Sequence, residues 1–172
     1  MKAVFPILVA AALACPTASP AAADSAAQDT ARQFYSACLK LKPSGLPTGE
    51  QMKTLAPLLS AELVKLIASA RRTQEEFIRK HPDDKPPWIE GDLFASNFEG
   101  VSSFKLGTAA FNADKASIPV YLEYRDGKDV MRWIDVVVLE RANKRWRVWD
   151  IYMNAPWPFR SGPNLRAMLS SE

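Results

Sequence analysis

Apolar residues in the first half of the chain recur at three- and four-residue steps, which is the spacing of one helix face. From Asp24 onward this spacing predicts a helix, which Pro43 and Gly45 end. Its apolar stripe consists of Ala27, Ala31, Phe34, Tyr35, Cys38 and Leu41. Because Cys38 is on that stripe, we interpret it as a small buried hydrophobe rather than a nucleophile.

Two further helices are predicted before the middle of the chain. Thr48 and Gln51 have the spacing of a capping box, which opens a short helix. Ser60 caps a longer helix that ends at His81. Charges of both signs on one side of this helix indicate a solvated face. The polar segment 83–87 connects the helices to the second half of the chain.

The second half changes to an alternation of apolar and polar residues, which is the period of a half-buried strand. Short polar turns join the strands, so they should pair antiparallel in sequence order. The fold class expected is therefore α+β, with N-terminal helices packed on a curved four-stranded antiparallel meander sheet. The predicted strands are residues 102–111, interrupted by Gly107, then 116–125, 130–141 and 145–153, and a short helix is predicted within 163–170.

Strand parity predicts which side chains share the inward face of this sheet. The even positions of 116–125 are apolar and should point inward. Two-residue turns are expected at 127–128 and 143–144. Each turn fixes which residues of consecutive strands lie directly opposite each other, and residues directly opposite each other share a face. The predicted inward residues are Trp133, Asp135, Val137, Leu139, Trp146, Val148, Asp150 and Tyr152.

Two carboxylates would then project among aromatic and aliphatic side chains. On this register Asp135 faces Tyr152, and Asp150 is a diagonal neighbour at about 7–8 Å. A buried carboxylate finds donors or raises its pKa, and paired carboxylates of this kind serve acid–base chemistry. Asp135 and Asp150 are therefore candidate catalytic residues. The alternative is that each accepts hydrogen bonds and holds the sheet to a loop.

The opposite face of the predicted sheet is too apolar to be simply solvated. It carries Ile134, Val136, Val138, Trp149 and Ile151. Either a second protomer covers it, which would make a homodimer through the outer sheet face, or the helices cover this face instead.

The N-terminal segment has the pattern of a secretory signal. Lys2, the apolar run 3–14 and Ala21-Ala22-Ala23 follow the order of charged region, apolar region and small-residue cleavage site. The apolar run is shorter than the roughly twenty residues that span a bilayer. We therefore predict a signal peptide at residues 1–23 and a single periplasmic or secreted domain at 24–172.

A second interpretation of the N-terminus is open. Ala12-Leu13-Ala14-Cys15 also resembles a lipobox, in which Cys15 would be acylated and the protein would be a membrane-anchored lipoprotein. The segment 16–27 would then be a flexible tether. In both cases Cys38 lacks an intramolecular partner, so no disulfide is expected.

Four short motifs mark the chain between residues 27 and 169. They are Phe34-Tyr35, Gly91-Asp92-Leu93-Phe94-Ala95-Ser96, Trp133-x-Asp135 and Trp146-x-Val148-x-Asp150-Ile151. In this order they resemble a bacterial exported family known as domain of unknown function 3828. The resemblance implies a nuclear-transport-factor-2-like, cystatin-like superfold with a cone-shaped pocket between helices and sheet. Trp133, Asp135, Trp146, Asp150 and Tyr152 would line that pocket, and Asp92 would lie at its rim.

Other chemistry finds little support in the sequence. The single histidine, His81, cannot supply a multi-histidine metal site, and we expect neither a metal nor a cofactor. Motifs of nucleotide-binding proteins, zincins and α/β-hydrolases do not occur. A formal net charge of +3 does not indicate a nucleic-acid-binding protein.

Three functions therefore remain open. The absence of a catalytic signature favours a non-catalytic module of the cell envelope that binds a small apolar ligand or an envelope protein. The second is a small pocket enzyme that uses Asp135 and Asp150. The third is an envelope inhibitor or immunity-type protein. Membrane contact is expected only if Cys15 is acylated.

Overall fold

The structure is a computed structural model, which describes residues 20–157 and 162–170. The predicted lipidation site, Cys15, and most of the predicted signal peptide lie outside the described residues. The predicted cleavage point after Ala23 falls in the first turn of the first helix. The first buried side chain described on that helix is Ala27, so cleavage there would leave its core contacts intact.

The helices lie where the apolar spacing predicts them. Thr48 and Gln51 form the predicted capping box, with reciprocal hydrogen bonds of 3.2 and 2.8 Å. The Ser60 hydroxyl accepts a hydrogen bond from the Leu63 N–H at 3.1 Å and caps the long helix, as predicted. The helical elements are α1 (Pro20–Leu41), α2 (Gly49–Leu55), the 3-10 turn η1 (Ala56–Leu58), α3 (Ala61–Lys80) and α4 (Leu165–Ser170).

The strands form one antiparallel sheet in the order β1-β3-β4-β5, with β2 also pairing with β3. The α+β class is confirmed, but the sheet has five strands rather than the predicted four. Gly107 divides the first predicted strand opposite Pro119, which has no N–H to donate to the ladder. The strands are β1 (Ser103–Leu106), β2 (Ala110–Asn112), β3 (Lys115–Asp126), β4 (Asp129–Ala142) and β5 (Arg145–Tyr152).

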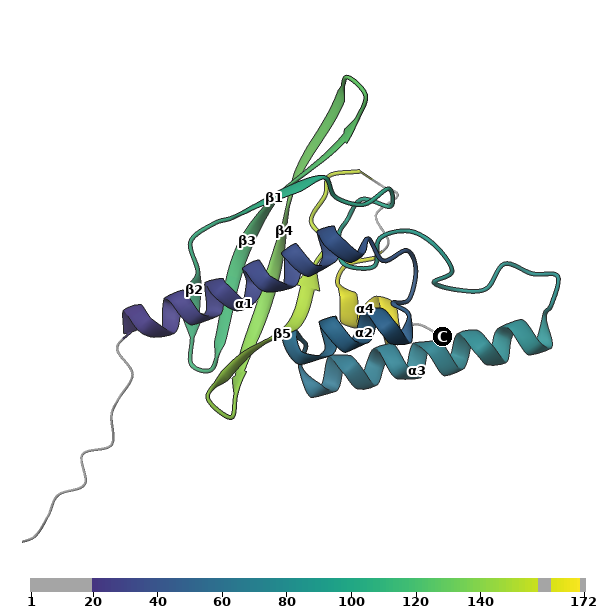
Figure 1. The fold of residues 1–172 in the computed structure, drawn as a ribbon, viewed down its shortest axis with the longest axis horizontal. Helices are drawn as coiled ribbons and strands as arrows, with labels where there is room; N and C mark the ends of the chain where they lie inside the picture. Colours follow the sequence, from purple (N-terminus) through teal and green to yellow (C-terminus); the bar gives the residue numbers. More distant parts are fainter. Residues whose placement is uncertain (1–19, 158–161, 171–172) are drawn as a thin grey trace, which may run out of the picture.

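The helix α1 crosses one face of the sheet, and α2, α3 and α4 are grouped beside β5 (Figure 1). The inward sheet residues pack with the stripe of α1 in a continuous core. The C-terminal half of α3 extends away from the sheet (Figure 1). The amide of Gln74, a buried residue of α3, donates to the Pro87 carbonyl and so fastens the returning connector to the helix.

The turns of the meander have the predicted two-residue length. Gly127 and Lys128 join β3 to β4, and Asn143 and Lys144 join β4 to β5. Both residues of the second turn have positive φ, 51° and 63°, as in a type I′ turn. The predicted inward positions of β4, and those of β5 up to Val148, are therefore confirmed, and each is at most 5% exposed.

Beyond Val148 the predicted parity is wrong. Val148 pairs with Leu139, whereas Asp150 pairs with Val138, so Trp149 is an extra residue in β5. Such a bulge reverses the face of every later side chain. Ile151 consequently lies in the core at 0% exposed, and Tyr152 turns outward at 41% exposed. Tyr152, predicted to line the pocket, therefore lies on the outer face. Ile151, predicted on the outer face, lies in the core.

Candidate functional site

Asp135 is a fully buried acceptor that holds three segments together. Its carboxylate accepts hydrogen bonds from the Ser96 N–H at 2.9 Å and from the Ser96 hydroxyl. It also accepts from the Trp133 indole at 3.0 Å and from the Asn154 N–H at 2.9 Å. With four donors the carboxylate is saturated, so its geometry fits the structural alternative rather than a catalytic base.

Asp150 lies on the other face of the sheet from Asp135. One of its oxygens accepts from the Ile151 N–H at 2.8 Å and from the Arg166 N–H at 3.1 Å in the first turn of α4. The pKa of Asp150 is raised, because the effect of burial exceeds the lowering effect of these two donors. The structure does not bring Asp135 and Asp150 together, so the paired site on which the predicted enzyme depends is not formed.

A cleft of about 620 Å³ opens elsewhere, between the C-terminal end of α1, the segment 90–102 and the end of β3. We name it the Asp92 cleft. Of the six predicted pocket residues only Asp92 lines it, while Trp133 and Trp146 are core residues, each 5% exposed. Its floor is formed by Tyr35, Cys38 and Asp92, its walls include Phe94, Phe98 and Tyr124, and its exposed rim carries Lys42, Glu90, Glu99 and Arg125.

The loop 91–100 sets the position of Asp92 through its own backbone. The Asp92 N–H donates to the Phe98 carbonyl at 3.0 Å, and its Oδ1 accepts from the Phe94 N–H at 2.8 Å. Gly91 has φ of 86°, and a Cβ there would lie 2.5 Å from the Phe98 ring. Only glycine fits this conformation and this close approach. The ring of Phe98, 44% exposed, is thereby seated at the mouth of the cleft.

The floor of the cleft concentrates groups whose pKa is raised by burial. The pKa of Asp92 is raised to about 6, chiefly by burial. The hydrogen bond from the Phe94 N–H lowers this pKa, and the charge of Asp135 raises it further. Burial also raises the pKa of Tyr35, to which Asp135, Cys38 and Asp92 add. The Cys38 thiol has a pKa raised by burial and then by Asp92. At neutral pH the floor therefore presents a phenol, a thiol and a carboxylate that is easily protonated.

Tyr35 contributes the least satisfied group of this floor. Its ring packs edge-to-face on Phe34, with centroids 5.2 Å apart, and tilts against Phe104 at 5.5 Å. The side chain is 2% exposed, yet its hydroxyl has no hydrogen-bond partner within the part of the chain that the structure describes. A buried hydroxyl without a partner costs about 1–3 kcal/mol.

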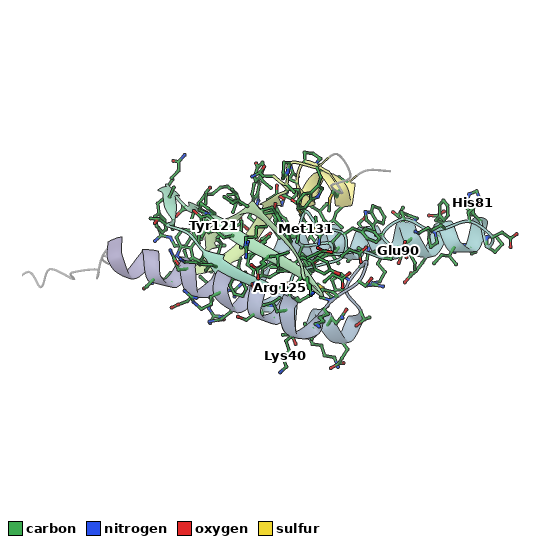
Figure 2. All side chains as sticks on the ribbon, turned by 90° about the horizontal axis from the view of Figure 1, so that it is seen from above. Lys40, His81, Glu90, Tyr121, Arg125 and Met131 are labelled. Atoms are coloured by element: carbon green, nitrogen blue, oxygen red, sulfur yellow. The ribbon has the colours of Figure 1, made fainter. Side chains whose placement is uncertain are left out.

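Two of the four charges at the rim, those of Glu90 and Arg125, are paired with neighbours. Lys85 pairs with Glu90, and Arg125 pairs with Glu123 at 2.6 Å. In Figure 2 Lys40 projects from α1 away from the sheet. The rim thus combines paired charges with exposed Lys42 and Glu99, and none of its cations forms an ion pair with the half-buried carboxyl of Asp92.

A second hollow, of about 540 Å³, lies along the outer sheet face. Tyr121 and Ile134 pair across β3 and β4 there and are 48% and 44% exposed. This is the face through which a homodimer is expected, and that expectation stays a prediction.

Comparison of the chain with protein-family models, with curated proteins and with solved structures finds no match. The resemblance to domain of unknown function 3828 therefore stays a prediction. Within residues 20–157 and 162–170, no helix combines the length and apolarity that a bilayer crossing requires. In the same ranges, no three His, Cys, Asp or Glu residues group as metal ligands would.

Most of the Asp92 cleft does not follow from the sequence pattern. The apolar spacing puts Tyr35 and Cys38 on the core stripe of α1, and strand parity puts Tyr124 on the inward face of β3. One signal was available, since Tyr35 places a hydroxyl on an otherwise apolar stripe beside Cys38. That hydroxyl required a partner, and the sequence alone does not show where the partner would come from.

Proposed function

We propose that this protein is a non-catalytic module that binds a small molecule in the Asp92 cleft. The volume of about 620 Å³ is within the range of small-molecule sites, about 300–1,000 Å³. Its aromatic walls offer contacts for an apolar part of a ligand, and its polar floor and charged rim offer groups that orient a polar part. On the signal pattern of residues 1–23 and the resemblance to an exported family, we place this binding in the cell envelope.

The observation that carries the proposal is the unpartnered hydroxyl of Tyr35. It is buried beside Asp92 and Cys38. The hydroxyl therefore loses its hydrogen bonds to water on folding, and no hydrogen bond within the described residues replaces them. A ligand group at the floor of the cleft would supply that bond. The saturated hydrogen bonding of Asp135 favours binding over the acid–base chemistry of the enzyme alternative.

The test compares a substitution that fills the cleft with one that does not. Leu39 lines the cleft, and Lys40, its neighbour on α1, is exposed and points away from the sheet (Figure 2). The full-length protein, Leu39→Trp and Lys40→Trp are each titrated with benzyl alcohol, benzylamine and benzoate, and amide shifts are followed by NMR.

We expect at least one of these probes to shift the amides of Phe98, Gly100 and Tyr124 in the parent protein and in Lys40→Trp. Leu39→Trp should abolish those shifts while keeping a folded spectrum. Absence of cleft shifts with all three probes would overturn the proposal, and so would shifts that persist unchanged in Leu39→Trp.

A further inference from the structure

We infer that the ligand of the Asp92 cleft carries a protonated amine, which binds between the carboxylate of Asp92 and the hydroxyl of Tyr35. This inference rests on the proposed function and adds the chemical class of the ligand. It follows from three features of the cleft: an open acceptor, an uncompensated negative charge and aromatic walls.

The open acceptor is Oδ2 of Asp92. The Phe94 N–H occupies Oδ1, at 2.8 Å. Oδ2 lies next to Gly100, whose added Cβ would be only 3.6 Å away, so the loop backbone passes close to this oxygen without bonding to it. Among the described residues no donor reaches Oδ2. An ammonium group, which has three N–H donors, would supply one.

The negative charge comes from two neighbouring carboxylates, Asp92 and Asp135. The donors to Asp135 are backbone amides, a hydroxyl and an indole, all of them neutral. Over residues 20–157 and 162–170, no lysine or arginine forms an ion pair with either carboxylate. Buried charges are ordinarily paired, so this floor attracts a cation and repels an anion.

Tyr35 and the walls favour the same class of ligand. The raised pKa of Tyr35 keeps its phenol protonated, so its oxygen can accept an N–H of the ligand. Phe98 and Tyr124 offer aromatic faces beside the floor, and a cation near such a face is bound more tightly. The cations of the rim, Lys42 and Arg125, are exposed and screened by solvent.

The binding should depend on pH through Asp92. The groups that face it are Tyr35 and Cys38 of α1 and Asp135 of β4, with Glu99, Lys42 and Arg125 at the rim. Because the pKa of Asp92 is about 6, the carboxylate is mostly ionised at about pH 7.5 and mostly protonated at about pH 5. The affinity for an amine should therefore fall by about tenfold between these two pH values.

The experiment uses three probes that differ mainly in charge: benzylamine, benzyl alcohol and benzoate. Each is titrated by NMR into the full-length protein, Asp92→Asn and Tyr35→Phe, with Asp126→Asn as the control for loss of an exposed carboxylate at the β3–β4 turn. At about pH 7.5 we expect benzylamine to bind the cleft at least about tenfold more tightly than benzyl alcohol, and benzoate to bind most weakly.

Asp92→Asn should remove the preference for the amine, Tyr35→Phe should reduce it severalfold, and Asp126→Asn should retain it. If benzyl alcohol or benzoate binds in the cleft as tightly as benzylamine, the inference is wrong while the proposed function stands. A preference for benzylamine that persists in a folded Asp92→Asn variant also overturns it. If no probe binds in the cleft, the proposed function itself fails.

Discussion

Asp135 and Asp150 lie on opposite faces of the sheet, although the two-residue turn between their strands predicts a shared face. The extra residue Trp149 in β5 separates them. Each carboxylate consequently has its own structural role. Asp135 joins β4 to the segments around Ser96 and Asn154 by hydrogen bonds. Asp150 accepts a hydrogen bond from the backbone N–H of Arg166 in the first turn of α4.

Replacing Asp135 should destabilise the fold strongly. Asp135→Ala leaves three buried donors and the part-buried Asn154 N–H without an acceptor, and each buried loss costs about 1–3 kcal/mol. We expect the free energy of unfolding to fall by at least about 3 kcal/mol, measured by urea denaturation followed by tryptophan fluorescence.

The milder substitution Asp135→Asn distinguishes the structural role from a catalytic one. An amide retains one acceptor oxygen but places an N–H toward donors, so this variant should also lose stability. A residue kept for catalysis alone typically leaves stability unchanged or improved when it is replaced. An Asp135→Asn variant as stable as the parent would therefore contradict the structural role.

Asp92 should make the folded protein less stable as the pH rises. Its pKa in the folded protein, about 6, exceeds the ordinary value of 3.8, so the folded state binds more protons between these values. The free energy of unfolding contributed by this group is fully present below about pH 4 and is lost as the pH rises through about 6. The loss is at most about 3 kcal/mol.

Asp92→Asn should accordingly raise the midpoint of urea unfolding at about pH 7.5 and flatten the change between about pH 4 and 6. The amide oxygen can still accept the Phe94 N–H, so the loop geometry is preserved. Asp126→Asn, at an exposed turn, serves as the control and should leave the pH profile as it is. A parent profile without any decline between about pH 4 and 7 would contradict the raised pKa.

Trp149 should stabilise the bulge through two cations. Lys115 Nζ lies 3.3 Å from its ring centroid, and the guanidinium carbon of Arg166 lies 4.5 Å from it. Trp149→Ala should lower the free energy of unfolding by about 1–3 kcal/mol, since it removes both contacts and the packing of the ring. Tyr152→Ala, at an exposed position of the same strand, should cost much less. Equal losses in the two variants would show that the cations contribute nothing.

Processing of the N-terminus should separate the two interpretations of Cys15. We expect cleavage after Ala23, so the intact mass of the exported protein should correspond to a chain that begins at Asp24. Cys15→Ala should then mature unchanged and remain in the soluble fraction. A parent protein that carries an acyl mass and moves out of the membrane fraction in Cys15→Ala would establish the lipoprotein alternative instead.

The elements and most of the register follow from the amino-acid sequence alone. The caps at Thr48 and Ser60, the helix spacing and the two-residue turns depend on residues that are close along the chain. Strand parity therefore predicts correctly that Trp133, Asp135 and Trp146 lie on the inward face. These features are local, and local preferences are readable from a single chain.

The bulge at Trp149 and the position of the cleft depend instead on contacts between distant segments. The ring of Trp149 contacts Lys115 of β3 and Arg166 of α4, which are distant from it in the sequence. The alternation of polar and apolar residues does not predict these contacts. The Asp92 cleft likewise exists because the end of α1, the loop 91–100 and the end of β3 converge. Whether the hydroxyl of Tyr35 is a core group or a binding group depends on that convergence, because packing between distant segments determines which polar atoms are left without a partner.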